Sequence, residues 1–433
     1  MTSKTILSAC AALLFVAACG EPDVILPGER FAVGDDAGTV NEVRDIALPA
    51  MVANANWTHR NGGPDHRTQH PALAANLSQV FSVQIGEGDV AGARITADPV
   101  VSDGVIYTLD ARSRVTATGT NGAPVWAVSV LPGNANPTSA SGGGIAVANG
   151  RVFVTTGFGE LTALDARTGG TLWTQDLDAP GGSSPTVVGD LVYLVSRNSV
   201  GWALDVTNGR IRWQLDGIPS VAGFGGGAGV AVEGDLAVFP FPSGQVVGAF
   251  PQGGLQRWST VVTGQRRGSA AAVISDISGD PVIDGNRVYV GNFAGSVVAL
   301  ESFTGERIWT ATEGAVSPVW PTGNSLFLVN DLSQLVRLDA SDGSVVWRVQ
   351  LPEFTTETGL FRERVTRFAH YGPVLAGGRL IVPGSDGVIR QFDPRSGSLV
   401  GSVEIPGGAS SNPVVAGRTL YVVSKTGNLV AFR

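Results

Sequence analysis

Short strands of alternating apolar and polar residues, separated by tight turns, recur along most of this chain. The clearest unit is an apolar strand ending in Ala-Leu-Asp, a turn that contains Gly, and a second strand that contains Trp. Four copies occupy residues 162–173, 202–213, 298–309 and 336–347, and looser copies end at Trp126 and Trp258. The tryptophans are 47, 40, 45, 51 and 38 residues apart. A period of about 40–50 residues with several short strands per unit is typical of a β-propeller blade.

The number of blades follows from the first and last strands of each unit. A Pro before an apolar strand marks six first strands, at Pro99, Pro185, Pro281, Pro318, Pro373 and Pro413, and degenerate versions begin near Gly144 and Gly227. The last strand carries Trp in six units, and Gly401 stands at the Trp position in a seventh. The final unit stops at Arg433 without a last strand. Residues 77–85 supply the missing strand, with Phe81 in the Trp position. We predict an all-β, eight-bladed propeller of four-stranded blades, closed by this N-terminal strand, which removes a free sheet edge.

The repeated residues have structural explanations. We expect each Trp to pack against the neighbouring blade, each Gly to adopt the positive φ of its turn, and each Asp to accept backbone N–H bonds within that turn. A cofactor site made from the Trp rings would be a single site. The regular recurrence of the rings therefore favours packing.

The N-terminal residues 1–18 have the features of a signal peptide. A positive start with Lys4 precedes an apolar stretch, residues 6–16, which is too short for a permanent membrane span. The following Val-Ala-Ala-Cys19 resembles the lipobox of bacterial lipoproteins. The resemblance implies cleavage before Cys19, lipidation of its thiol and amine, and an outer-membrane anchor on the periplasmic side, because Gly20 rather than Asp follows. Cys10 fits the pattern less well, since cleavage there leaves little apolar sequence, and an ordinary secretory signal is the alternative.

Residues 19–56 are predicted to be a lipid-anchored tether and residues 57–433 the propeller. The tether contains three prolines and several acidic residues without a sustained period. One compact apolar patch, residues 25–30, offers a docking segment as the alternative to a plain linker. With Cys10 removed and Cys19 lipidated, the mature chain forms no disulfide.

Composition argues against nucleic acid as a partner. The chain has 433 residues, 15% of them charged, with a net charge of −8. The longest basic cluster is the Arg266–Arg267 pair. Binding to phosphates needs clustered positive charge.

The candidate metal-binding and catalytic groups do not form a recognisable site. The spacing of His59, His66 and His70 matches no zinc pattern, so we expect this segment to be a folded cap over the ring. The series Asp276, Asp280 and Asp284 lacks the oxygen spacing of a calcium loop and fits turn roles. No catalytic triad or phosphate-binding loop is present. We therefore expect no cofactor, no metal, no small-molecule substrate and no enzymatic activity. The charged insertion at 361–368 is predicted to be a solvated loop, with a second contact surface as the alternative.

The repeat, over residues 77–433, resembles the pyrroloquinoline-quinone-type propeller repeat. Among families with this repeat, quinoprotein alcohol dehydrogenases require a carboxylate-bound metal, an Asp base and usually a Cys-Cys pair, none of which this sequence offers. BamB-type lipoproteins of the outer-membrane β-barrel assembly machinery match the lipobox, tether, blade number and closing strand. That resemblance implies a non-catalytic scaffold that binds periplasmic domains of the central barrel-assembly subunit and aids outer-membrane protein insertion. A propeller lipoprotein that binds peptidoglycan, a peptide or another envelope partner is the alternative.

Two long links between blades, 218–229 and 262–276, match the places where this family presents its partner-binding surface. The resemblance carries over to candidate contact residues, which are Val221, Gly223 and Phe224 in the first link and Arg266, Arg267 and Asp276 in the second. The sequence departs from the family in both links, because the first lacks the Leu-x-Leu-Arg run and the second has one of the two usual Asp residues. Two solvated connections without a contact role are the alternative.

Overall fold

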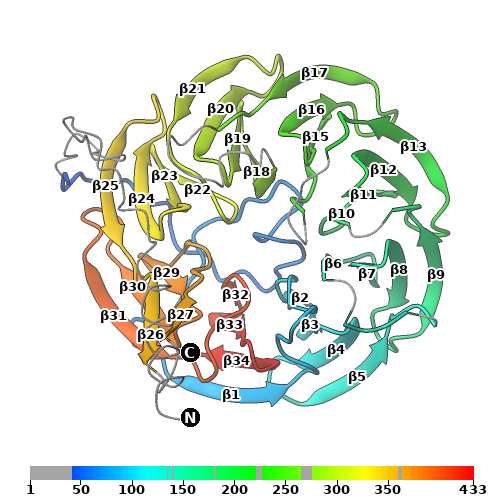
Figure 1. The fold of residues 1–433 in the computed structure, drawn as a ribbon, viewed down its shortest axis with the longest axis horizontal. Helices are drawn as coiled ribbons and strands as arrows, with labels where there is room; N and C mark the ends of the chain where they lie inside the picture. The colour runs from blue at the N-terminus through cyan, green and yellow to red at the C-terminus, as the bar shows by residue number, and fades with distance from the viewer. Residues whose placement is uncertain are drawn as a thin grey trace, which may run out of the picture. The chain divides into compact units, whose positions relative to one another are not determined.

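Four-stranded antiparallel sheets follow one another around a ring, each formed by strands close in sequence (Figure 1). The computed structural model describes residues 41–133, 135–138, 141–179, 182–220, 227–264, 276–358 and 363–433. Blade 1 contains β2 (Val100–Ser102), β3 (Val105–Leu109), β4 (Arg114–Gly119) and β5 (Pro124–Ser129). Blade 2 contains β6 (Gly143–Ala148), β7 (Arg151–Thr156), β8 (Glu160–Asp165) and β9 (Thr171–Asp176). Blade 3 contains β10 (Thr186–Val188), β11 (Leu191–Ser196), β12 (Val200–Asp205) and β13 (Ile211–Asp216). Blade 4 contains β14 (Ala231–Glu233), β15 (Leu236–Pro240), β16 (Gln245–Ala249) and β17 (Gln256–Val261).

The second half of the chain continues this order. Blade 5 contains β18 (Ile277–Asp284), β19 (Arg287–Asn292), β20 (Ser296–Glu301) and β21 (Arg307–Ala311). Blade 6 contains β22 (Trp320–Thr322), β23 (Ser325–Val329), β24 (Gln334–Asp339) and β25 (Val345–Gln350). Blade 7 contains β28 (Val374–Ala376), β29 (Arg379–Pro383), β30 (Val388–Phe392) and β31 (Leu399–Glu404). Blade 8 contains β32 (Val414–Ala416), β33 (Thr419–Val423) and β34 (Asn428–Phe432), together with β1 (Gln79–Gln84). Within the described residues this makes eight four-stranded blades, so the predicted propeller is confirmed.

The ring closes as the sequence predicts. Strand β1 pairs with β34, so an N-terminal strand becomes the outer strand of blade 8. Phe81 pairs with Ala431, in the same register as Trp173 with Ala163 in blade 2. The aromatic position is therefore equivalent in the first and last units.

The repeated residues act within and between blades as expected. The indole of Trp126 donates to the carbonyl of Ala166 in the next blade at 3.0 Å, and corresponding bonds are made by Trp173, Trp213, Trp258 and Trp309. Gly169 has a φ of +73°, and a Cβ there would lie 2.7 Å from the Trp126 ring. Asp165 accepts the backbone N–H of Thr168 at 2.8 Å. Each unit thus joins its turn to the Trp of the preceding blade.

The tether prediction requires a correction over its described part, residues 41–56. The backbone N–H of Glu42 donates to the carbonyl of Val346 at 3.0 Å, and the Asn54 side chain donates to the carbonyl of Val415 at 2.7 Å. These residues are bound to blades. Their polar sequence misled the prediction because its partners are backbone groups distant in the chain.

The described part of the charged insertion before blade 7 contains a strand, and the solvated loop expected there is wrong. Strands β26 (Phe354–Thr358) and β27 (Glu363–Arg367) pair as a separate two-stranded sheet (Figure 1). The Phe and three Thr of residues 354–358, which have high β-propensity, were the available signal for a strand. In the described part of the chain, no helix is long and apolar enough to cross a membrane.

Candidate functional site

The two faces of the ring carry different parts of the chain. Because the strands of a blade are antiparallel, successive connections alternate between the faces. We call the side with the first-to-second and third-to-fourth strand turns the turn face, for example 234–235 and 250–255 of blade 4. The links between blades, such as 217–230 and 262–276, begin and end on the opposite side. We call that side the connection face.

Residues 52–73, which we call the collar, run around the centre of the turn face (Figure 1). They form hydrogen bonds with the first strands of the blades or with the turns that follow. The pairs are Asn54 with Gly417, Trp57 with Val101, Thr58 with Val147, His59 with Val187, Pro64 with Val232, Asp65 with Ile283, and Pro71 with Gly377. These reach blades 8, 1, 2, 3, 4, 5 and 7, and Trp57 stacks on Trp320 of blade 6 with ring centroids 6.4 Å apart. The predicted cap is confirmed, and it contacts every blade.

The three collar histidines bind the backbone at separate places. His59 Nε2 accepts the N–H of Val187 at 3.0 Å, and burial lowers the pKa of His59 to about 3, so its ring is neutral. His66 donates to the carbonyl of Pro281 at 2.9 Å. His70 Nε2 accepts the N–H of Gly378 at 2.7 Å. The described residues contain no group of three His, Cys, Asp or Glu side chains placed to hold a metal ion.

The centre of the ring is closed by an arginine between two carboxylates. Arg60 Nε lies 3.2 Å from Asp98 Oδ2 of the segment entering blade 1 and 3.2 Å from Asp280 Oδ2 of blade 5. The side chains of both aspartates are buried. Burial alone lowers the pKa of Arg60, but the negative charges of Asp280 and Asp98 raise it above its usual value. Asp280 therefore has an ion-pair role, and the turn role expected for it is wrong.

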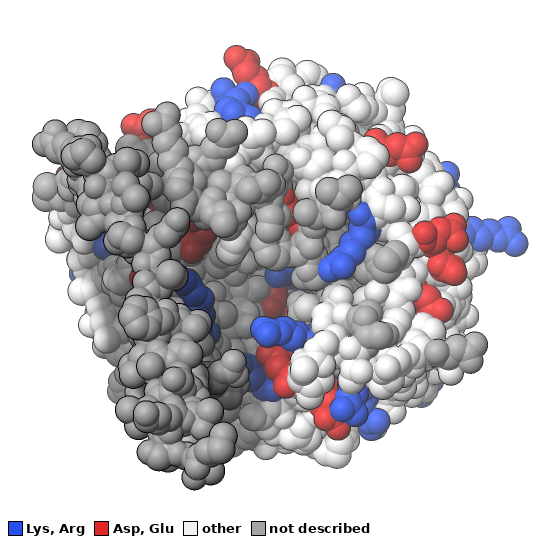
Figure 2. All heavy atoms as spheres, in the orientation of Figure 1, with Lys and Arg blue, Asp and Glu red and all other residues white. Residues whose placement is uncertain are grey.

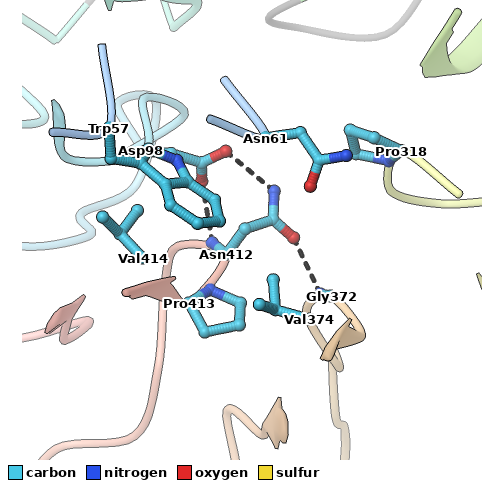
Figure 3. Close-up of a pocket in the computed structure, with 9 residues that line it drawn as sticks. All are labelled: Trp57, Asn61, Asp98, Pro318, Gly372, Val374, Asn412, Pro413 and Val414. Carbon is cyan, nitrogen blue, oxygen red and sulfur yellow. Dashed lines mark hydrogen bonds between the residues drawn. The ribbon is translucent and has the colours of Figure 1, made fainter. Parts of the chain in front are cut away.

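Further polar bonds extend this centre to other blades (Figure 3). The backbone and side-chain N–H groups of Asn412 donate to Asp98 at 2.7 and 2.8 Å. Its side-chain oxygen accepts from Gly372 at 2.8 Å and from Ser317 at 3.0 Å. On the other side, the N–H of Gly229 donates to Asp280 at 2.6 Å. Except for Gly229, these residues and Asp280 directly precede the Pro of a first strand. The sequence therefore marked their positions without revealing that they meet.

The cavity left beside these groups is very small. Its lining residues include Trp57, Asn61, Asp98, Pro318 and Asn412, and its volume is about 10 Å³ (Figure 3). A space of this size holds about one water molecule. Hydrogen bonds and ion pairs among the collar and the first strands therefore fill the centre of the ring beside this cavity.

The predicted contact residues fall mostly outside the described part of the chain. This applies to Cys19 and to five residues of the two long links, which are Val221, Gly223, Phe224, Arg266 and Arg267. Asp276 is described and lies immediately before β18, with only 3% of its surface exposed. The structure therefore places Asp276 inside the ring wall.

Apolar side chains are exposed at the described margins of the connection face. Ile218 at the start of the first long link is 51% exposed, and Phe354 and Val365 of the β26–β27 hairpin are 55% and 57% exposed. Figure 2 shows acidic and basic side chains mixed over the face in view, with both signs around a central hollow. The charges on the described part of this face do not form a continuous basic track.

Solved structures share this fold. BamB from Moraxella catarrhalis matches with a TM-score of 0.68 and 17% identity, covering 83% of this chain and all of that one. A europium-containing methanol dehydrogenase matches with a TM-score of 0.64 and 16% identity, covering 87% and 98%. At these identities the likeness concerns the fold alone.

Sequence comparison identifies relatives named as BamB. An outer membrane protein assembly factor BamB of Shewanella oneidensis is 27% identical over 288 residues, covering 66% of this chain and 69% of the relative. The BamB of Salmonella typhimurium is 25% identical over 358 residues, covering 81% and 88%. The sequence model described as outer membrane protein assembly factor BamB matches residues 102–349, more than half of the chain. This protein therefore belongs to the BamB family of outer membrane protein assembly factors.

Proposed function

We propose that this protein is a non-catalytic scaffold of the outer-membrane β-barrel assembly machinery. It binds periplasmic domains of the central barrel-assembly subunit and aids the folding and insertion of outer-membrane proteins. Lipidated Cys19 anchors it to the outer membrane on the periplasmic side. The observation that carries the proposal is the family match over residues 102–349, which contains both long links between blades.

The centre of the ring supports a scaffold role. Collar residues occupy the turn face at the centre, and Arg60 is bonded to carboxylates from two blades. The cavity beside them has room for about one water molecule. A surface outside this centre is thus the more suitable place for a large partner.

The connection face is the proposed contact surface. Both long links begin and end there, and the exposed Ile218, Phe354 and Val365 lie at its described margins. Phe and Arg are enriched at protein interfaces, so Phe224 and Arg266 are the proposed contacts within the links.

Purification of the tagged full-length protein from its native membrane in mild detergent, followed by mass spectrometry, tests the proposal. Near-stoichiometric recovery of the central barrel-assembly subunit is the expected result. Recovery of the protein alone, or with peptidoglycan fragments, contradicts the scaffold role and favours a wall-binding or other envelope function.

A double variant tests the contact surface. Phe224→Ala with Arg266→Ala is expected to reduce capture of the subunit about tenfold, the effect of losing roughly 1.4 kcal/mol of binding free energy, without changing the melting temperature. The matched control is Phe303→Ala with Arg167→Ala, because both residues are exposed in turns of the turn face. Equal capture by the two double variants would exclude the links as the contact surface.

A further inference from the structure

One position of the repeat is occupied differently in blade 6. The third-strand residue that pairs with the outer-strand aromatic position is Ala117, Ala163, Ala203, Gly248, Ala299 and Ala431 in six blades. In blade 6 this residue is Arg337, which pairs with Trp347, and in blade 7 it is Gln391. A buried guanidinium is unfavourable unless its N–H groups are bonded. The partners of Arg337 therefore indicate why blade 6 departs from the repeat.

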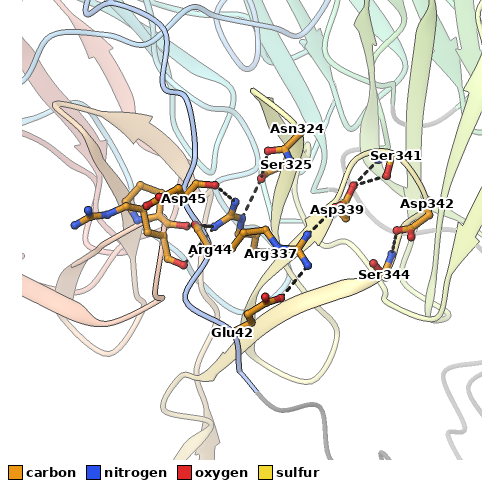
Figure 4. A network of polar contacts seen from close by, with 12 residues as sticks. Glu42, Arg44, Asp45, Asn324, Ser325, Arg337, Asp339, Ser341, Asp342 and Ser344 are labelled. Carbon is orange, nitrogen blue, oxygen red and sulfur yellow. Dashed lines mark hydrogen bonds and ion pairs between the residues drawn. The ribbon is translucent and has the colours of Figure 1, made fainter.

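Arg337 is fully buried and joins three parts of the chain. Its Nε donates to the Ser325 hydroxyl of its own blade at 2.9 Å. Its terminal nitrogens donate to the carbonyls of Arg44 at 2.6 Å and Asp45 at 3.2 Å (Figure 4). A further bond of 3.3 Å reaches the carbonyl of Arg395 in a turn of blade 7. The planar fork of an arginine suits several acceptors at fixed positions.

Residues 41–45 continue from this point along the outer strand of blade 6. The N–H of Glu42 donates to the carbonyl of Val346 at 3.0 Å. The Asn41 side chain donates to the carbonyl of Arg348 at 2.9 Å and accepts its N–H at 3.0 Å. The Arg44 guanidinium lies 2.7 Å from Asp339 and 2.8 Å from Glu42 (Figure 4). The segment is thus bonded to the free edge of β25.

The effect on this edge is visible when the outer strands are compared. The residue before the Trp position is Val125, Leu172, Ile308 and Val400 in blades 1, 2, 5 and 7, and these side chains are 50%, 47%, 42% and 53% exposed. Val346 occupies the same position in blade 6 and is 2% exposed. Blade 6 is therefore covered where these other blades are open.

We infer that the outer edge of blade 6 is a docking site for residues 41–45 of the same chain, and that Arg337 specifies this site. Residue 41 is then the first described residue that is bonded to the ring. If Cys19 is the anchor, which rests on the proposed function, 22 residues separate the membrane from this point and span at most about 75 Å. Release of the docked segment up to the collar at residue 52 would lengthen the tether about 1.5-fold.

Hydrogen–deuterium exchange on the full-length detergent-solubilised protein tests the inference without a membrane or a partner. Arg337→Ala introduces the residue found at this position in five other blades, so the blade is expected to remain folded. Exchange in residues 41–48 should become at least tenfold faster, and trypsin should cleave after Arg44 at least tenfold faster. The control is Gln391→Ala, which alters the same repeat position in blade 7 and is expected to leave both rates unchanged.

Two outcomes would overturn the inference. Equal protection of residues 41–48 in the two variants would show that Arg337 does not hold the segment. Loss of protection throughout β22–β25 would show that Arg337 supports blade 6 as a whole. Because neither measurement involves the barrel-assembly subunit, the docking inference and the proposed scaffold function fail independently.

Discussion

The turn face and the connection face of this ring use their polar and apolar groups differently. On the turn face, the collar bonds with seven blades and stacks on the eighth, so the chain itself satisfies the ends of the first strands. On the connection face, apolar side chains such as Phe354 and Val365 remain more than half exposed. The collar therefore maintains the ring at the centre of the turn face, although the rim of that face also exposes apolar side chains such as Phe303, at 68%. The proposed contact with a partner lies on the connection face.

The largest expected effect comes from removing the cation at the centre. Arg60→Met would leave Asp98 and Asp280 buried without their counter-ion. Breaking one partner from a buried ion pair typically costs about 3–5 kcal/mol. Urea unfolding should therefore show a loss of that order in the free energy of unfolding.

An exposed ion pair of the same collar gives the control. Arg67 lies 3.1 Å from Asp284, and their side chains are 44% and 28% exposed. Exposed pairs contribute about 0–1 kcal/mol, so Arg67→Met should have little effect. Similar losses for the Arg60 and Arg67 variants would contradict a special role for the ring centre.

The collar should also make folding sensitive to acid. The pKa of His59 is about 3 in the folded protein and about 6.5 in an unfolded chain. The unfolded state therefore binds the proton first as the pH falls below 6.5, and stability is lost across this window. Linkage predicts about 1.4 kcal/mol per pH unit, or roughly 2–3 kcal/mol between pH 6.5 and 4.5.

Comparison with His59→Gln isolates this contribution, because Gln can accept a hydrogen bond but does not titrate in this range. Unfolding free energies measured from pH 7 to 4.5 should converge for the two proteins as the pH falls. Parallel curves would show that His59 does not remain neutral in the collar.

The smallest effect on stability is expected on the connection face. Phe354→Ser with Val365→Thr removes exposed apolar groups from the β26–β27 hairpin, and the free energy of unfolding should change by less than about 0.5 kcal/mol per substitution. If the hairpin contributes to the contact surface, capture of the barrel-assembly subunit should fall about fivefold, as for a residue worth ~1 kcal/mol at an interface.

Val125→Thr provides the matched control for the hairpin, since Val125 is 50% exposed on the outer strand of blade 1. It should alter neither stability nor capture. A loss of capture with this control equal to that of the hairpin variant would place the contact on the outer strands and remove the distinction between the faces.

Local patterns explain how much of the fold could be predicted. The Trp, Gly and Asp of each unit act within one turn and its neighbouring blade, so their spacing was sufficient to predict eight blades and the closing role of β1. The collar was predicted as a cap, but its partners were not, because His59 and Val187 are 128 residues apart. The hairpin was missed because its charged residues were taken as a sign of solvated loop.

Arg337 shows the same limit within a correctly predicted strand. Its departure from Ala was readable in the repeat, yet its acceptors include carbonyls 293 and 292 residues away. Backbone carbonyls are present at every position and leave no signal in the sequence. Asp280 is a similar case, because its distance from Arg60 is set by the closure of the ring.

The sequence by itself determined the repeat, the number of blades and the strand that closes them, because these depend on short-range alternation and turn chemistry. Only the tertiary structure decided that Arg60 lies between Asp98 and Asp280, that the collar contacts all the blades, and that residues 41–45 cover the edge of blade 6. These features arise when ring closure brings distant backbone and charged groups within bonding distance, and buried polar groups must then find partners.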